Sequence, residues 1–226
     1  MSLTPVAAEQ LAAVVTTLEM RTVPDGLVIP PSSLRLDRRG RIAPDAYRTL
    51  FRLVGAPWLW FSRLVMSNAD LSRVVHDDEV ELFAVVDAAG NDVGMLELDF
   101  RSAGECELAF LGLVPALAGQ GHGRWLLAHA ITRAWRPGVT RVHVHTCTLD
   151  HPAALATYRR AGFIAVSRAV DSSTRASPAC SRPTAHLTSR CWERRSLLPP
   201  AARRAARIVP KIKSGSLPAP PRWRPR

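Results

Sequence analysis

Several features are scarce or absent in this chain of 226 residues, and each absence excludes a class of protein. Its four cysteines form no Cys-x-x-Cys pair and match no zinc-binding spacing, and reduced thiols are typical of the cytoplasm. No apolar run approaches the roughly 18 residues of a membrane-spanning helix, and the N-terminus lacks the basic and apolar regions of a secretion signal. We therefore expect a soluble, cytoplasmic protein with no membrane span.

Lysine is missing from residues 1–170, where 17 arginines balance 17 acidic residues. The formal net charge of +11 therefore comes from residues 171–226, in which 13 basic residues face only Asp171 and Glu193. The high isoelectric point thus gives no argument for nucleic-acid binding by the rest of the chain. Because residues 171–226 also hold half of the prolines and show no periodic apolar pattern, we expect a domain over 1–170 and a basic, Pro/Arg/Ser/Ala-rich, disordered tail.

Three interpretations of this tail stay open. It is a basic arm for nucleic acid or an anionic membrane, a solvated extension, or the product of a shifted reading frame. The last would explain why an Arg-, Pro-, Ser- and Ala-rich end follows a well-patterned domain so abruptly. A nucleic-acid partner is expected only through the tail, if at all.

The spacing of apolar residues over 1–170 predicts a mixed α/β fold. For example, Tyr47, Leu50, Phe51 and Val54 recur at helical spacing before Gly55 ends the pattern. In chain order, the expected elements are a strand over 13–20, a loop over 24–41, helices over 44–54, 59–65 and 70–75, strands over 81–86, 93–100 and 105–114, a helix over 123–135, a strand over 141–147, a helix over 152–161 and a strand over 163–168.

A glycine-rich turn separates the strand over 105–114 from the helix that follows it. Gly119, Gly121 and Gly123 allow the backbone to adopt positive φ and to approach a ligand closely, while the first N–H groups of the helix point into the turn. An anion such as a phosphate suits that arrangement. The spacing matches neither the P-loop nor the dinucleotide-binding fingerprint. The glycines could also serve only to allow a tight turn between the strand and the helix.

A second informative segment runs from Leu155 to Phe163 and places Tyr158 shortly before a Gly-Phe pair. The turn and this segment together resemble the GNAT superfamily of N-acetyltransferases, closely over residues 75–168 and loosely over 15–67. The resemblance implies a central mixed β-sheet flanked by helices and acetyl-coenzyme A as co-substrate. The family also has one more strand after the last one expected here. No segment of the tail fits that strand, which would leave a sheet edge unpaired.

The resemblance assigns the glycine turn to the pyrophosphate of acetyl-coenzyme A. Ala118 stands where the family usually has Gln or Arg, so we expect weakened binding, with Gln120 and Arg124 as substitutes. His151 stands where many members have an Asn that contacts the cofactor, although it equally suits a helix start before Pro152. The expected cofactor-binding residues are Leu113, Val114, Gly119, Gln120, Gly121, His122, Gly123, Arg124 and His151.

The strand over residues 111–114 is expected to offer backbone partners to the thioester carbonyl and the pantetheine amides, provided that it splays from the next strand. Gly112 would help such a splay, or it would simply admit a bulky neighbour. Either interpretation explains a glycine in a strand.

Two residues are candidates for the proton transfers of acetyl transfer. The resemblance gives Tyr158 the role of general acid, against the alternative of a packed helix tyrosine. Glu107 is the candidate base, linked to the amine by a water chain, against the alternative of a solvent-facing carboxylate. Glu105, Glu97 and Asp99 lie on neighbouring strands and could also serve.

The histidines raise the question of a metal ion. His143 and His145 alternate on one strand, but no acidic or cysteine partner completes a recognisable set with them and with His122, His129 or His151. No metal ion is expected.

The sequence thus predicts an N-acetyltransferase that passes an acetyl group directly from acetyl-coenzyme A to a primary amine. The acceptor is open: a small amine, an amino acid or a peptide N-terminus. Trp58, Trp60 and Phe61 form either an apolar acceptor wall or part of the core. A homodimer is compatible with this interpretation. The alternative is a noncatalytic acyl-CoA-binding or degenerate GNAT-like protein whose basic tail binds nucleic acid.

Overall fold

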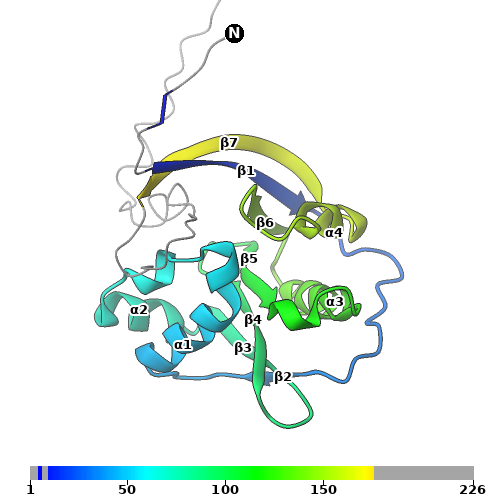
Figure 1. Ribbon diagram of the computed structural model, residues 1–226. Coiled ribbons are helices and arrows are strands. Elements are labelled where there is room, and N and C mark those ends of the chain that lie inside the picture. Colours follow the sequence, from blue (N-terminus) through cyan, green and yellow to red (C-terminus); the bar gives the residue numbers. More distant parts are fainter. Residues whose placement is uncertain (1–4, 7–9, 176–226) are drawn as a thin grey trace, which may run out of the picture. The chain divides into compact units, whose positions relative to one another are not determined.

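The computed structural model describes residues 5–6 and 10–175, which form one seven-stranded mixed sheet in the order β2-β3-β4-β5-β6-β1-β7 (Figure 1). Only the pair β5–β6 is parallel, and all other neighbours are antiparallel. The expected mixed sheet flanked by helices is confirmed. The strands are β1 (Gln10–Met20), β2 (Arg35–Arg38), β3 (Val80–Val86), β4 (Asp92–Asp99), β5 (Glu105–Leu113), β6 (Arg141–Cys147) and β7 (Ile164–Arg175).

Two pairs of helices lie on opposite faces of the sheet (Figure 1). The helices α1 (Pro44–Gly55) and α2 (Asn68–Val75) cover one face, and α3 (His122–Ala134) and α4 (Ala154–Arg160) cover the other. The helix α1 begins with a proline, which its first turn tolerates, and buries the apolar stripe that its sequence predicts. None of the helices in the described part of the chain has the length and apolarity needed to cross a bilayer.

Each face of the sheet has its own apolar core. Leu98, Cys106, Leu108, Val142 and Val144 belong to the larger core, which packs beneath α3 and α4. The smaller core lies beneath α1 and α2 and contains the four predicted residues of α1 together with Leu82, Ala84 and Met95. Because side chains alternate along a strand, β5 and β6 present their intervening residues to the α1 and α2 side.

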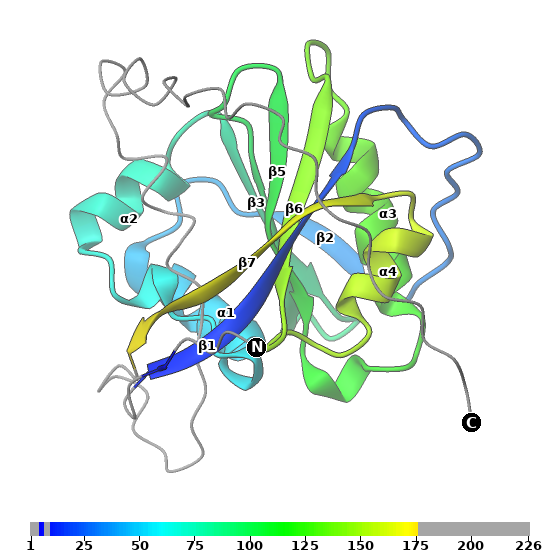
Figure 2. The same ribbon diagram turned by 90° about the horizontal axis from the view of Figure 1, so that it is seen from above.

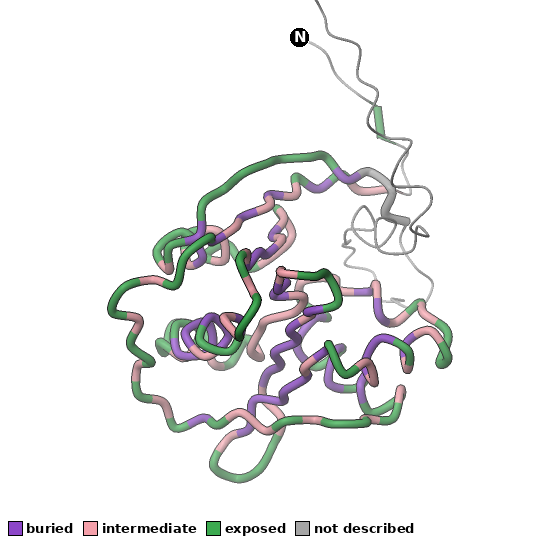
Figure 3. The backbone as a smooth tube through the Cα atoms, turned by 180° about the vertical axis from the view of Figure 1, so that it is seen from behind, coloured by how far each residue is buried: buried purple, intermediate pink, exposed green. Residues whose placement is uncertain are grey.

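The N-terminal strand β1 lies between β6 and β7 and pairs with both (Figure 2). The partner of β7 is therefore β1 and not a further strand, and β7 itself forms the edge of the sheet. No strand follows β7 in the described residues. The strand β7 is longer than the expected 163–168 because β1 offers it a partner as far as Arg175. Residues 164–170 of this strand are exposed, including Ile164 and Val170 (Figure 3).

Three other expectations need correction. The expected loop over 24–41 contains the four-residue edge strand β2, whose mostly charged sequence Arg-Leu-Asp-Arg carries no apolar alternation. The expected helix over 59–65 is replaced by two short 3₁₀ turns, Ala56–Trp58 and Ser62–Leu64, because Leu59 adopts a left-handed φ of 62° between them. The expected tail begins too early at residue 171, since β7 includes residues 171–175; residues 176–226 lie outside the described part.

Candidate active site

The strands β5 and β6 diverge in the middle of the sheet. Their parallel ladder contains three pairs and ends where Glu107 lies opposite His143, although β5 continues to Leu113 and β6 to Cys147. A register shift between β4 and β5 adds Ala109 at the same place, as in a β-bulge. The backbone of β5 beyond Glu107 is therefore not paired with β6, which is the splay that the sequence analysis anticipates for residues 111–114.

Gly112 is explained by packing within this splayed strand. A Cβ atom at Gly112 would lie 2.7 Å from Val54 Cγ1 and 3.1 Å from Trp60 Cη2. The smaller core therefore presses directly on the backbone of β5 here. Of the two interpretations of Gly112, the structure favours the one in which glycine admits a bulky neighbour.

The glycine turn presents a series of backbone N–H groups at the start of α3. Gly119 and Gly121 have φ values of 77° and 86°, and within the described residues the N–H groups of residues 119–123 have no hydrogen-bond acceptor. A Cβ atom at Gly119 or Gly123 would meet nothing within 4 Å, so the space beside both glycines is open. Five consecutive free donors at a helix N-terminus favour an anion. We call residues 119–123 the nest.

The side chains around the nest differ in their engagement. Gln120 Nε2 donates a hydrogen bond to Ala116 O at 2.9 Å, and His122 Nδ1 lies 2.9 Å from Ser32 Oγ, so both side chains are held by the protein. Arg124 is exposed, and its Nη2 lies 3.9 Å from a Cβ atom placed at Gly121. Of the two expected substitutes for the family's side chain at Ala118, Arg124 is the one still available to a ligand.

The other expected cofactor-binding residues lie along the same edge or near it. Leu113 ends β5, and the N–H group of Val114 donates to Val93 O at 2.9 Å. His151 is exposed and accepts a hydrogen bond from the Ala153 N–H group through Nδ1 at 3.1 Å, so it supports the start of α4. Its ring also contacts Trp58, with 5.2 Å between the ring centroids.

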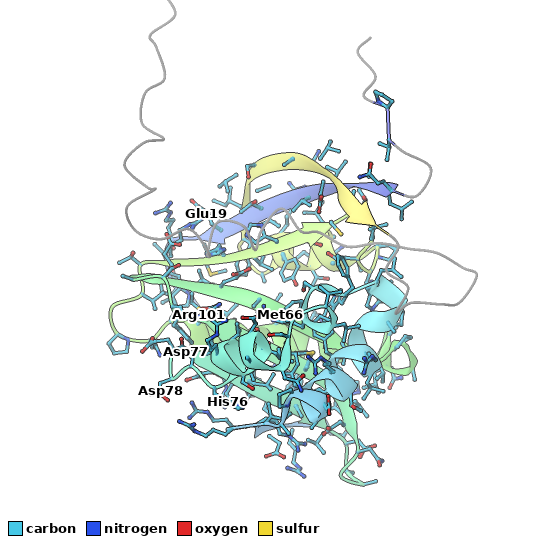
Figure 4. All side chains as sticks on the ribbon, turned by 90° about the vertical axis from the view of Figure 1, so that its left-hand side faces the viewer. Glu19, Met66, His76, Asp77, Asp78 and Arg101 are labelled. Carbon is cyan, nitrogen blue, oxygen red and sulfur yellow. The ribbon has the colours of Figure 1, made fainter. Side chains whose placement is uncertain are left out.

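The four candidate carboxylates share the α1 and α2 side of the sheet, but three of them are engaged. Glu97 is fully buried; its Oε1 lies 2.7 Å from Arg63 Nη2, and its Oε2 accepts a hydrogen bond from Tyr47 at 2.5 Å. Asp99 pairs with Arg101, which Figure 4 shows together with Asp77 around α2. Glu105 pairs with Arg141.

Glu105 belongs to an ion-pair cluster that ties β1, β5 and β6 together. Arg141 Nη1 lies 3.0 Å from Glu105 Oε2, and Arg141 Nε lies 2.7 Å from Glu19 Oε2. Glu19 lies on β1, apart from the residues labelled around α2 in Figure 4. Within the described residues, Glu107 is thus the candidate acid that has no ion pair.

Glu107 is buried at the point where β5 leaves β6. Burial raises the pKa of its carboxyl well above the usual value, and the neighbouring Asp99 raises it further, while Arg63 opposes the shift. A buried carboxylate with an elevated pKa has the affinity for a proton that a general base needs. The alternative of a solvent-facing strand carboxylate does not fit this burial.

Tyr158 is buried on α4 within the larger core, with its ring 5.8 Å from that of Phe163. Burial raises its pKa, with Asp150 adding to the shift, so the phenol keeps its proton at neutral pH. In the described residues no acceptor is found for its hydroxyl group. Tyr158 is therefore packed, as a structural helix tyrosine would be. It also has a protonated hydroxyl group, as a general acid requires.

Two of the histidines, His143 and His145, lie close to Glu107, and the other candidate histidines lie apart from them. Donor atoms of His143, His145 and Glu107 all lie within 4.8 Å of one another. Burial lowers the pKa of both histidines to about 4. His129 instead packs against Trp125 on α3, and neither it nor His122 or His151 belongs to this group. The acid that the sequence analysis does not find for the histidine pair comes from the adjacent strand.

The aromatic residues over 58–61 divide between the two expected roles. Trp60 packs against Phe51 and Phe110, with ring centroids 5.6 and 5.2 Å apart, and Phe61 is buried, so both serve the core. Trp58 is only partly buried and faces His151.

Sequence reasoning does not identify Arg63 or Tyr47 as contributors to this side of the sheet. Tyr47 on α1 and Arg63 in the second 3₁₀ turn both donate hydrogen bonds to the Glu97 carboxylate. The sequence carries no signal for that contact, because a single arginine between Ser62 and Leu64 is usually a surface residue and Tyr47 fits the apolar stripe of its helix.

Comparisons with known proteins identify the family of this chain. Residues 47–163, more than half of the chain, match the model of the acetyltransferase (GNAT) family. No curated protein matches the chain in sequence. Among solved structures, a functionally unknown conserved protein from Staphylococcus epidermidis ATCC 12228 is similar at a TM-score of 0.50 and 12% identity, covering 71% of this chain and 61% of that one.

Two further solved structures are similar over comparable lengths. A Drosophila protein has a TM-score of 0.52 at 14% identity and covers 73% of this chain and 51% of its own. A GCN5-related N-acetyltransferase from Kribbella flavida has a TM-score of 0.48 at 18% identity and covers 70% of this chain and 56% of its own. The chain spans only 51–61% of the length of these three proteins. On the family match over residues 47–163, the chain belongs to the acetyltransferase (GNAT) family.

Proposed function

We propose that this protein is an N-acetyltransferase that passes an acetyl group from acetyl-coenzyme A directly to a primary amine. The observation that carries the proposal is the nest, whose five free N–H groups lie just beyond the splayed end of β5. Family membership supports acyl transfer in general. Acetyl-coenzyme A as donor and a primary amine as acceptor are the finer part of the proposal, and the nest, Glu107 and Tyr158 support it.

The nest suits the pyrophosphate of coenzyme A. Backbone donors at a helix N-terminus stabilise an anion without any side chain, which compensates for the alanine at position 118. Arg124 adds an exposed guanidinium beside Gly121. From the nest, the pantetheine arm would follow β5 past Val114 and Leu113, where the splay leaves backbone groups unpaired with β6.

Glu107 and Tyr158 would carry out the two proton transfers. As the amine nitrogen attacks the thioester carbonyl carbon, Glu107 accepts a proton from the amine, directly or through water. As the bond between carbon and sulfur breaks, Tyr158 donates its proton to the departing sulfur, so that free coenzyme A leaves as a thiol. The phenolate then recovers a proton from solvent, and Glu107 returns its own.

The acceptor would bind on the α1 and α2 side, where Glu107 lies. A small amine, an amino acid and a peptide N-terminus all present the required primary amine. Trp58, the partly buried member of the aromatic group, is the side chain available to contact an apolar part of the acceptor. We place the reaction in the cytoplasm, consistent with the free thiols of Cys106 and Cys147.

The test is release of coenzyme A thiol from acetyl-coenzyme A in the presence of a panel of primary amines. Tyr158→Phe and Glu107→Gln should each lower kcat by about 10²- to 10⁴-fold with little change in the KM for acetyl-coenzyme A. Tyr47→Phe is the matched control, because Tyr47 is the other tyrosine of the chain and its hydroxyl serves Glu97. Glu105→Gln tests the neighbouring acid in the same way.

Two outcomes would contradict the proposed roles. Full activity in Tyr158→Phe and Glu107→Gln would remove both residues from the chemistry. Binding of acetyl-coenzyme A without turnover on any amine would favour the noncatalytic acyl-CoA-binding alternative. In that case, salt-sensitive retention on nucleic acid that disappears on removing residues 176–226 would locate a nucleic-acid interaction in that segment.

A further inference from the structure

A compact group of three metal-binding side chains lies where β5 and β6 part. Glu107 and His143 are directly opposite each other in the parallel ladder, and His145 follows two residues later on the same face of β6. One donor atom from each of the three lies within 4.8 Å of the others. All three come from strands rather than from loops, so the backbone fixes their spacing.

We propose that Glu107, His143 and His145 bind a divalent transition-metal ion of the Zn²⁺ class. Two imidazole nitrogens and one carboxylate oxygen are a donor set that Zn²⁺, Co²⁺ and Ni²⁺ accept. Ligand atoms at about 2.0–2.1 Å around a tetrahedral ion lie roughly 3.4 Å apart. The three side chains, whose donor atoms lie within 4.8 Å of one another, would therefore have to draw together around the ion. Three protein ligands leave a further coordination position for water.

Outer contacts support this use of the two histidines. His143 Nε2 lies 3.7 Å from Glu105 Oε2, and His145 Nδ1 lies 3.2 Å from Thr17 Oγ1. The His145 contact is within hydrogen-bond distance, whereas the His143 contact is longer than a hydrogen bond. Metal-binding histidines commonly have such outer partners, which orient the ring.

The charge at the three residues also suits a cation. Acidic groups outnumber arginines among the side chains that act on Glu107 and His143. The acids are Glu19, Glu97, Asp99 and Glu105, and the arginines are Arg63, Arg101 and Arg141. Arg21 also pairs with Glu19, so these neighbouring charges balance. The negative charge at the site would come from Glu107, whose carboxyl would lose its proton on binding the ion.

A bound ion would have a consequence for catalysis, and this part of the inference rests on the proposed function. The ion takes the lone pairs of the Glu107 carboxylate, which is the proposed base. Acyl transfer should therefore be suppressed by Zn²⁺ and restored by a chelator. Binding of the ion itself does not depend on the protein being an acetyltransferase.

Binding is tested by titrating Co²⁺ into the full chain and recording its visible absorption. The wild-type protein should bind one ion per chain at this site, and Zn²⁺ should displace it. His145→Ala and Glu107→Gln should weaken the affinity at least about 100-fold, since even loss of an outer partner costs about 10- to 100-fold. His129→Ala is the matched control, because it removes a histidine that lies outside the group.

The spectrum separates this site from one made by cysteines. Ligation by nitrogen and oxygen alone gives no thiolate-to-cobalt charge-transfer band, and circular dichroism confirms that each variant is folded. Wild-type affinity in both folded variants, or a thiolate band, would overturn the proposed site. Metal binding that fails while amine acetylation persists would refute the site alone. Metal binding without any acetylation would instead refute the proposed function.

Discussion

The two faces of β5 and β6 differ completely in chemistry although they share the same backbone. Toward α3 and α4, the strands present Cys106, Leu108, Val142 and Val144, all at most 2% exposed. Toward the opposite face, the alternate positions carry Glu107 and the two histidines, and these are also largely buried. Burial alone therefore does not separate structural from functional positions here, whereas the polarity of what is buried does.

This difference implies a division of labour. An apolar side chain gains free energy from burial, whereas a buried ionisable group loses hydration and must be compensated. The polar face uses ion pairs for Glu97, Asp99 and Glu105, but leaves Glu107 without one in the described residues. We infer that the cost is tolerated at Glu107 because the position serves chemistry.

The largest effect on stability should come from breaking the buried ion pair on the polar face. Arg63→Met leaves the fully buried Glu97 without its guanidinium and should lower the free energy of unfolding by about 3–5 kcal/mol in urea denaturation. Replacing both residues, as Arg63→Met with Glu97→Met, should recover most of the loss. Failure of the double variant to recover would show that Arg63 stabilises the fold through other contacts.

A comparison of adjacent residues on β5 addresses the two faces directly. Leu108→Ala, at a position 2% exposed, should cost about 2–5 kcal/mol because it leaves a cavity in the larger core. Glu107→Gln keeps the shape and removes a costly buried charge, so it should change the unfolding free energy by less than about 1 kcal/mol. Equal losses in the two variants would contradict the division of labour.

Smaller effects than that of Leu108→Ala, and of opposite sign, should appear at two glycines of the nest. Gly121→Ala forces a side chain into a φ of 86° and should cost about 1–2 kcal/mol. Gly123→Ala lies in the first turn of α3 with open space around it and should stabilise the protein by about 0.5 kcal/mol. Thermal unfolding midpoints should thus shift in opposite directions. A higher midpoint in both variants would mean that Gly121 is not conformationally required.

The features that sequence could predict are those encoded within short segments. The nest depends on glycines spaced by two residues and a helix start, and α1 depends on one apolar stripe, so local periodicity was sufficient for both. The resemblance selects Tyr158 by the Gly-Phe pair that follows it, and its role as general acid stays a prediction. The shared face of the candidate acids also followed from simple strand alternation.

What sequence could not predict depends on which strands become neighbours. Glu107 and His143 meet only because β5 and β6 pair in parallel, and no local pattern specifies that register. The insertion of β1 beside β7 is likewise a tertiary result, which explains why the expected sheet edge was misjudged. The contact between Arg63 and Glu97 requires a 3₁₀ turn to fold over β4.

Calorimetric titration of acetyl-coenzyme A into the full chain tests the central claim, that the nest holds the acyl donor. Gly121→Glu introduces a carboxylate into the nest, and Gly90→Glu makes the same change at a glycine with a similar φ of 89° and open surroundings in the turn between β3 and β4. We predict micromolar binding by the wild-type protein, Gly90→Glu and Tyr158→Phe, and no binding by Gly121→Glu. Undiminished binding by a folded Gly121→Glu variant, or none by the folded wild-type chain, would contradict the account.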